Sequence, residues 1–127
     1  MRPLANSSNP GIRKARKEFI AMTTEKFPAI GHIYEAGFGE LAFRLQFDTD
    51  GSTMRFTKAD APDFSGAQAV AYRALAIRPG VFMVTWTEAD KTTVTHVEDF
   101  ESGVVHTNIT GPNLNFLNLS GSWKKVA

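Results

Sequence analysis

The fold is decided by the stretch Gly80-Val-Phe-Met-Val-Thr-Trp-Thr-Glu88, which a short turn separates from Thr93-Val-Thr-His-Val-Glu-Asp-Phe-Glu101. Both stretches are rich in β-branched and aromatic residues, which pack well on the pleated surface of a sheet. Neither has the spacing of three to four residues between apolar positions that an amphipathic helix requires. We therefore expect two strands that pair as a hairpin around a turn at residues 88–91.

Similar runs continue in both directions from this hairpin, separated by turns that contain Gly, Asn or Asp. Short runs at regular intervals are typical of a sandwich or a barrel. The expected strands are residues 32–36, 40–47, 53–57, 68–77, 81–87, 92–100, 104–110 and 113–119. Closing such a meander removes exposed sheet edges and encloses space for side chains or one small ligand. The sequence thus predicts an all-β domain, a single up-and-down antiparallel β-barrel of the calycin or lipocalin-like type with about eight strands.

Composition narrows the range of functions. The 127 residues have room for one domain and contain no cysteine, which excludes disulfides and thiolate metal ligands. The net charge of +1 gives no basic field that would attract nucleic acid. No apolar run approaches the ~20 residues of a membrane span, and the N-terminus lacks the apolar region of a secretory signal. We expect a cytoplasmic domain that binds neither nucleic acid nor membranes.

The N-terminal residues 1–28 differ from the rest of the chain. Gly and Pro break regular structure there, and residues 11–20 form one basic, helix-compatible run. This run either contacts an anionic surface or is a solvated, disordered tail. Met22 is an alternative start of translation. The expected organisation is a tail at residues 1–28 and a barrel domain at residues 29–127.

The inward face of the barrel has to be inferred from strand pairing, because residues 81–87 are apolar on both faces. If the turns at residues 79–80, 88–91 and 102–103 are tight, pairing defines two sets of side chains. The first set is Arg73, Leu75, Ile77, Trp86, Thr95, Val97, Asp99, His106 and Asn108; the second is Tyr72, Met83, Val94, His96, Glu98, Phe100, Val105 and Ile109. A slip of one residue in any hairpin exchanges the memberships. The first set is typical of a small-molecule pocket, and the alternative is a filled core.

Three segments carry a family resemblance: residues 80–88, residues 93–101 and Val105-His-Thr-Asn108. They resemble the calycin-like barrels of the molybdenum-cofactor-biosynthesis protein F (MoaF) family and, more distantly, the bacterial phenolic acid decarboxylases. The resemblance extends over residues 31–123. It implies a barrel that holds its functional side chains in the lumen.

The decarboxylase resemblance implies two tyrosines on the first strand, an arginine on a following strand and a glutamate after Trp-Thr, all pointing inward. Tyr34, Arg55 and Glu88 match three of these positions, and His32 replaces the other tyrosine. The matched residues imply a carboxylate held by Arg and Tyr and a proton moved by Glu. His32, in place of a tyrosine, departs from the pattern of the decarboxylases.

The three histidines, His32, His96 and His106, raise the question of a metal site. His96 and His106 are expected on opposite faces of the sheet, so no metal is expected. A pair of His106 with Asp99 across the hairpin is the more credible arrangement, since the carboxylate would fix the imidazole tautomer. A phosphate loop, a dinucleotide fingerprint and a Gly-x-Ser-x-Gly elbow are absent from the sequence, and no cofactor is expected.

These observations give three hypotheses. The first is a MoaF-like barrel that binds a small apolar or aromatic anion in a lumen lined by Tyr34, Arg55, Arg73, Trp86, Glu88, His106 and Asn108. The second is a cofactor-free lyase for a small aromatic acid, with Glu88, Tyr34 and Arg55 as catalytic residues. The third is a structural or interaction barrel with a filled core. Dimerisation through an outer sheet face is compatible with each of them.

Overall fold

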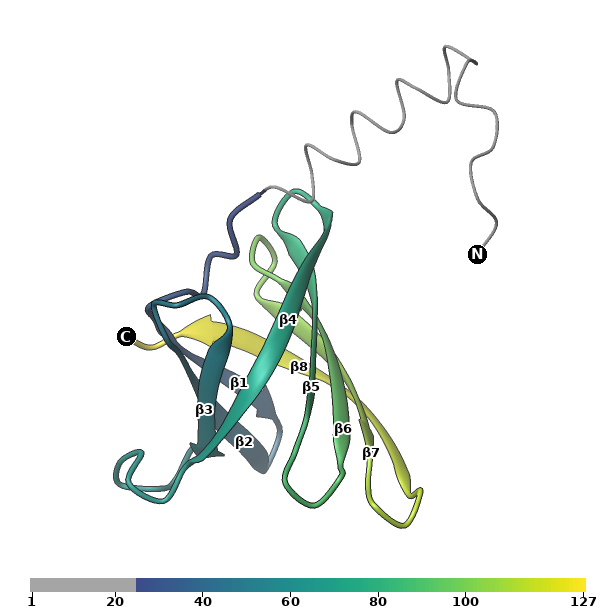
Figure 1. Ribbon diagram of the computed structural model, residues 1–127. Helices are drawn as coiled ribbons and strands as arrows, with labels where there is room; N and C mark the ends of the chain where they lie inside the picture. Colours follow the sequence, from purple (N-terminus) through teal and green to yellow (C-terminus); the bar gives the residue numbers. More distant parts are fainter. Residues whose placement is uncertain (1–24) are drawn as a thin grey trace, which may run out of the picture.

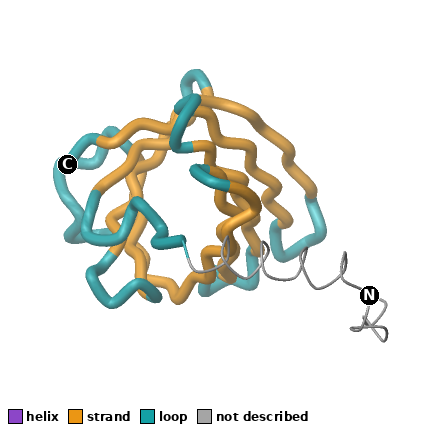
Figure 2. The backbone as a smooth tube through the Cα atoms, turned by 90° about the horizontal axis from the view of Figure 1, so that it is seen from above, coloured by secondary structure: helices purple, strands orange, loops and turns teal. Residues whose placement is uncertain are grey.

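The computed structural model describes residues 25–127, which form a closed barrel of eight antiparallel strands (Figure 1). The strands are β1 (Ile33–Phe38), β2 (Leu41–Phe47), β3 (Thr53–Lys58), β4 (Gln68–Arg78), β5 (Val81–Thr87), β6 (Thr93–Asp99), β7 (Val104–Thr110) and β8 (Phe116–Lys125). Each strand pairs with the next, and β8 pairs back with β1; Figure 2 shows the ring from above. The prediction of an all-β, up-and-down barrel is confirmed. The basic run at residues 11–20 and the alternative start at Met22 lie outside the described residues.

The turns form where the sequence places Asp and Gly. Asp50 Oδ1 accepts hydrogen bonds from the backbone N–H groups of residues 52 and 53, both at 2.9 Å, and Asp99 Oδ1 accepts from residues 101 and 102, both at 3.0 Å. These bonds lower the pKa of both carboxyl groups. Gly80 turns the β4–β5 hairpin with a φ of +79°, a conformation that favours glycine. Local chemistry therefore sets where the strands end.

The register of the β4–β5 hairpin differs from the expected one. A shift of pairing between Ala76 and Arg78 inserts an irregularity next to the turn. As a result Tyr72 stands opposite Trp86, and Arg73 falls on the outer face of the barrel. A bulge moves every side chain beyond it to the other face, because the side-chain period of a strand is two.

The pairing of the β5–β6 hairpin also differs from the expected one, by one residue in its loop. Its loop runs over residues 88–92 rather than 88–91, so Val94 is the cross-strand neighbour of Trp86. The two differences together correct the expected faces. Tyr72, Val94, His96, Glu98 and Val105 lie inside with Trp86, whereas Arg73, Leu75, Ile77, Thr95, Val97, Asp99, His106 and Asn108 lie on the outer face.

One end of the barrel, called the closed end below, is covered by the segment that precedes β1. Phe27 and Ala29 in this segment are buried at 5% and 0% exposure. The Phe27 ring lies 5.2–5.8 Å, between centroids, from the rings of Phe47, Tyr72, Phe82 and Phe100. Phe27 is thus part of the core, although the sequence analysis assigns it to the tail.

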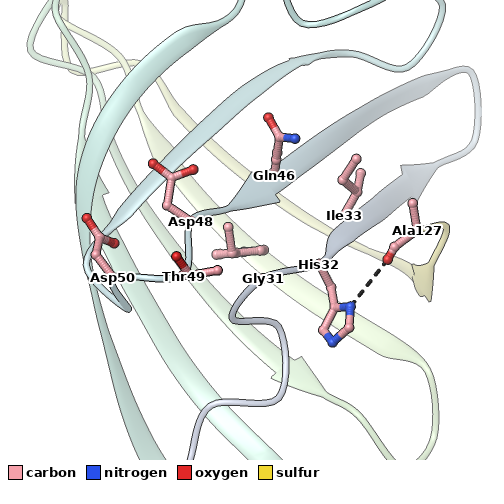
Figure 3. Close-up of a pocket in the computed structure, with 9 residues that line it drawn as sticks. Gly31, His32, Ile33, Gln46, Asp48, Thr49, Asp50 and Ala127 are labelled. Carbon is pink, nitrogen blue, oxygen red and sulfur yellow. Dashed lines mark hydrogen bonds between the residues drawn. The ribbon is translucent and has the colours of Figure 1, made fainter.

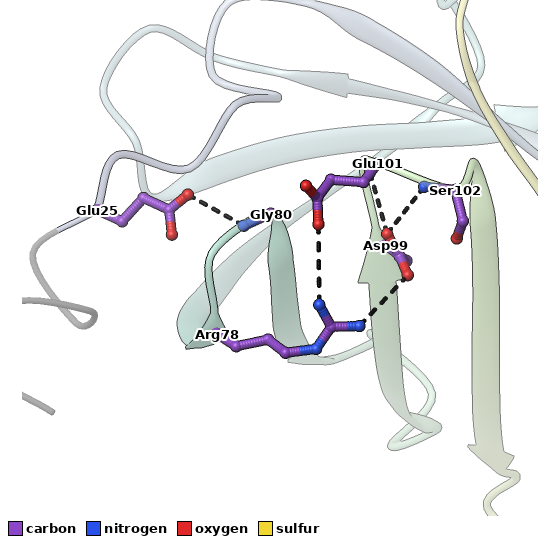
Figure 4. A network of polar contacts seen from close by, with 6 residues as sticks. All are labelled: Glu25, Arg78, Gly80, Asp99, Glu101 and Ser102. Atoms are coloured by element: carbon purple, nitrogen blue, oxygen red, sulfur yellow. Dashed lines mark hydrogen bonds and ion pairs between the residues drawn. The ribbon is translucent and has the colours of Figure 1, made fainter. Parts of the chain in front are cut away.

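Polar contacts hold this segment on the closed end (Figure 4). Glu25 Oε1 accepts a hydrogen bond from the backbone N–H of Gly80 at 3.1 Å. Beside it, Arg78 reaches Asp99 at 3.9 Å and Glu101 at 3.8 Å. Arg78 and Glu101 are largely exposed, so solvent screens these ion pairs and their contribution is small.

Closure of the barrel depends on a close crossing of β1 and β8. A Cβ atom on Gly121 would lie 1.9 Å from the carbonyl oxygen of Gly37, so only glycine fits. Strand β8 continues to Lys125, beyond the end expected at residue 119. Past the crossing, Trp123 stacks on Tyr34 with centroids 4.9 Å apart and 18° between the rings. The aromatic stack packs the β1–β8 seam from inside.

Candidate functional site

The end opposite Phe27, called the open end, contains a cavity of about 50 Å³, and with its mouth the recess measures about 390 Å³. We call this space the luminal cavity. Most of the wall is apolar and aromatic, and two lining residues, Glu88 and His96, can ionise. The lining residues are Ala36, Phe38, Phe43, Leu45, Phe56, Trp86, Glu88, Val94, His96 and Ile109. They come from β1, β2, β3, β5, β6 and β7 and from the start of the β5–β6 loop.

Glu88 lies beside Trp86 at the wall of this cavity. The indole Nε1–H of Trp86 donates a hydrogen bond to Glu88 Oε2 at 3.2 Å. Partial burial raises the pKa of Glu88, and this hydrogen bond acts in the opposite direction. The Glu88 carboxyl group thus places a hydrogen-bond acceptor in a mostly apolar wall.

A second carboxyl group lies deeper in the barrel. Glu98 is completely buried and its Oε2 lies 2.9 Å from His96 Nδ1. The two residues are two positions apart on β6, which puts both side chains on the inner face. Burial raises the pKa of Glu98, while the hydrogen bond and the charge of His96 oppose that shift. The His96 ring packs edge-to-face against Trp86 at 4.8 Å and Trp123 at 6.0 Å.

Four buried polar atoms have no hydrogen-bond partner within residues 25–127. They are Tyr72 OH, Glu98 Oε1, Thr107 Oγ1 and Trp123 Nε1. All four residues belong to the inner face, and each is at most 5% exposed. A buried polar group without a partner costs about 1–3 kcal/mol of stability. Buried polar groups in native proteins are usually hydrogen-bonded, so these four atoms are available to bind water or a polar ligand.

Two tyrosines share the interior with Glu98. Burial raises the pKa of the Tyr72 phenol to about 12, and nearby carboxylates, Glu98 among them, add to the shift. The pKa of Tyr34 is also raised, first by burial and then by Glu98. Both phenols therefore keep their protons at neutral pH and are available as hydrogen-bond donors.

The residues expected to line one pocket are divided between the two faces of the barrel. Tyr34 and Trp86 are buried inside, and Glu88 lies at the wall of the luminal cavity. The others are exposed on the outer face. Arg55 donates to Gln46 Oε1 at 2.8 Å, Arg73 lies in a shallow outer groove along β4–β6, His106 Nδ1 lies 2.7 Å from Ser120 Oγ, and Asn108 is bonded to Asn118.

The histidines follow the same division. His96 and His106 lie on opposite faces as expected, but His96 is inside and His106 outside, the reverse of the expected assignment, and the expected pair of His106 with Asp99 does not form. Within residues 25–127 no three His, Asp or Glu side chains come together as a metal site. The sequence analysis did not select His96 and Glu98 as site residues. In the sequence, Val94, His96 and Glu98 alternate along one face of β6, which could have identified them as inward-facing. The error in the predicted register placed that face outside the barrel.

His32 lies outside the barrel, in a recess beside the closed end (Figure 3). Its Nδ1 lies 3.3 Å from the backbone oxygen of Ala127. Gln46, Asp48 and Asp50 also line this recess, which is wide and open to solvent. The position of the decarboxylase family's first tyrosine is thus occupied by a residue that does not face the lumen.

Comparisons with known proteins identify a family and a similar solved structure. A family model described as MoaF-like matches residues 30–124. A crystal structure from Burkholderia vietnamiensis, described as that of a proposed beta-lactamase, has a TM-score of 0.73 and 31% sequence identity, and the match covers 81% of this chain and 100% of that one. No curated protein matches the chain. No helix in residues 25–127 has the length and hydrophobicity needed to cross a membrane.

Proposed function

This chain belongs to the MoaF-like family, and from that premise we propose that it is a small-molecule-binding barrel whose ligand enters the luminal cavity from the open end. The observation that carries the proposal is the contrast between an apolar cavity at that end and the few polar groups that converge on it. Binding sites for small molecules have this composition. The closed end is filled by Phe27 and its aromatic neighbours, so the open end is the route of entry.

The size of the cavity limits what it holds. An apolar cavity of about 150 Å³ takes up a benzene ring, whereas the luminal cavity has about 50 Å³. We therefore assign the cavity to the polar end of the ligand, a few non-hydrogen atoms long. An apolar or aromatic body would then occupy the mouth between Phe38, Phe43 and Phe56.

The charge of the ligand is argued from the same lining residues. Neither Lys nor Arg lines the luminal cavity within the described part of the chain, because Arg55 and Arg73 lie on the outer face. An anionic ligand would depend on His96 alone and would face Glu88. A neutral hydrogen-bonding group suits this wall better than the anion expected from the sequence.

The lyase alternative loses its main support with the placement of Arg55. That mechanism needs Tyr34 and Arg55 to hold one carboxylate, and the two residues are on opposite faces of the barrel. The serine residues of this chain also give no support for the beta-lactamase activity named in the description of the Burkholderia protein. Ser122 and Lys125 have the Ser-x-x-Lys spacing, but on strand β8 residues three apart point to opposite faces.

The experiment compares two dyes that share a naphthyl-phenyl amine body. N-phenyl-1-naphthylamine is neutral, and 1-anilinonaphthalene-8-sulfonate carries a sulfonate. We expect the neutral dye to bind more tightly, as measured by its fluorescence increase. Ile109→Trp fills the luminal cavity and should weaken binding at least tenfold, whereas Ile77→Trp on the outer face should not change it.

Glu88→Gln tests the cavity wall in the same assay and should leave the binding of the neutral dye within about threefold, since an amide oxygen still accepts from Trp86. Native mass spectrometry of the purified protein, before and after denaturation, gives an independent measurement of any small molecule retained from the cell. Equal loss of dye in the Ile77→Trp and Ile109→Trp variants would contradict binding in the lumen.

A further inference from the structure

We propose that His96 and Glu98 form an acid–base pair that moves a proton to and from a carbon atom next to the carbonyl group of a ligand in the luminal cavity. The substrate class is a small, mostly apolar ketone or aldehyde with an acidic C–H bond. This inference rests on the proposed function, because the ligand must first enter the barrel.

The geometry of the pair is that of an oriented base. Glu98 Oε2 lies 2.9 Å from His96 Nδ1, so the carboxyl group occupies that nitrogen and fixes the imidazole tautomer. The other ring nitrogen, Nε2, is left for exchange with a ligand. His96 belongs to the wall of the luminal cavity, whereas Glu98 lies behind it and is completely buried. His96 is the proposed catalytic residue and Glu98 its positioning residue.

Unpartnered hydrogen-bond donors share the barrel interior with this base. Of the four unpartnered polar atoms within residues 25–127, three carry a hydrogen to donate: Tyr72 OH, Thr107 Oγ1 and Trp123 Nε1. Thr107 is the cross-strand neighbour of His96, and the Trp123 ring lies 6.0 Å from the imidazole. Donors of this kind stabilise a developing enolate oxygen, and these three lie deeper in the barrel than the residues that line the luminal cavity.

The chemical step balances without any further reactant. The imidazole accepts a proton from the carbon next to the carbonyl, and the electron pair of that C–H bond becomes the carbon–carbon double bond of the enol. The imidazolium Nε2–H then gives this proton to the carbonyl oxygen as the π bond opens, and the imidazole returns to its neutral form. Nothing is oxidised or reduced, and the reverse step returns a proton to carbon. The raised pKa of the buried Glu98 carboxyl supports a proton shared within the pair.

The test uses the full chain in D2O with two neutral ketones, phenylacetone and cyclopentanone. Proton NMR of one sample reports binding, from line broadening of the ketone signals, and catalysis, from loss of the signals next to the carbonyl. A positioned general base contributes about 10²–10⁴-fold to a rate. We expect the wild type to exchange these protons and His96→Gln to be slower by about 100-fold or more.

His106→Gln is the matched control, because His106 is exposed on the outer face and contacts Ser120. It should exchange as fast as the wild type. Because His96→Gln removes a buried ring, His96→Ala with free imidazole in solution is a second variant, and imidazole should restore part of the rate. Glu98→Gln should lower the maximal rate without a similar change in KM, and it should shift the pH profile.

The outcomes separate this inference from the proposed function. Ketones that bind but exchange no faster than in buffer, or equally fast in wild type and His96→Gln, would overturn the acid–base pair and leave ligand binding intact. If neither ketone broadens and neither dye binds, the proposed function fails and the pair fails with it.

Discussion

The two ends of this barrel use aromatic residues in opposite ways. At the closed end, Phe27 lies in the lumen and packs edge-to-face against Phe47 and Phe82. At the open end, Phe43 and Phe56 are only partly buried and line a cavity. The closed end satisfies its backbone turns with Asp50 and Asp99, whereas the interior leaves polar side-chain atoms unpaired.

The closed end therefore contributes mainly to stability, whereas the open end is the proposed site of ligand binding. Dense packing at one end supplies the free energy that a small domain needs, since each filled aromatic position removes apolar area from water. The other end retains a void and unpartnered donors, both of which lower stability. Substitutions at the two ends should therefore have different consequences, and three predictions test this.

The largest effect is expected for Phe27→Ala. Removing a fully packed phenylalanine from a core costs about 3–5 kcal/mol, and here it also opens the closed end to water. Denaturant unfolding followed by tryptophan fluorescence measures the change in the free energy of unfolding. A loss below about 1 kcal/mol would show that the segment before β1 does not close the barrel.

The matched substitution at the open end is Phe56→Ala, and its effect should be smaller. Phe56 lines the luminal cavity and is already partly exposed, so we expect a loss of about 1–2 kcal/mol. The same change removes one of the three rings between which the apolar body of the ligand is proposed to lie, so it should weaken binding of the neutral naphthyl dye. If Phe56→Ala destabilises the protein as much as Phe27→Ala, the two ends do not differ in the way described.

The third prediction concerns pH and the buried carboxyl group. The pKa of Glu98 is raised in the folded protein, so its protonated form is the one that folding favours. That contribution is complete below the ordinary value of 4.5 and is lost as the pH rises through the raised pKa. Relative to Glu98→Gln, the wild type should lose up to about 1.4 kcal/mol of unfolding free energy per pH unit in that window.

Chemical denaturation at several pH values measures this difference. The exposed carboxyl groups with lowered pKa, such as Asp50 and Asp99, change stability in the opposite direction. They are present in both proteins, so the comparison with Glu98→Gln cancels them. Parallel pH curves for the two proteins would contradict a raised pKa at Glu98.

The strands and the barrel could be predicted from the sequence because both depend on local signals. Alternating β-branched runs and turns with Asp50, Gly80 or Gly103 specify where the chain reverses. The last strand was expected to end at residue 119, but it continues through Gly121 to Lys125. In the structure that glycine is needed because the carbonyl oxygen of Gly37 passes too close for any side chain.

The candidate site could be predicted only in part, because it depends on register. Trp86 and Glu88 were identified from the resemblance, and both lie at the cavity. A bulge near Ala76 and one extra loop residue at 92 each reverse the faces, and neither leaves a strong signal in the sequence. These small irregularities brought His96 and Glu98 inside and left Arg73 outside.

The crossing of Gly37 and Gly121 also determines how the barrel assembles over time. Every other strand pairing joins neighbours in the chain and can form as a local hairpin within microseconds. The β1–β8 seam joins the two ends of the described chain, so it carries the largest loss of chain entropy and should form late. Until Trp123 reaches Tyr34, both edges of the sheet stay open to other copies of the chain, and the rate of that last step limits exposure to aggregation.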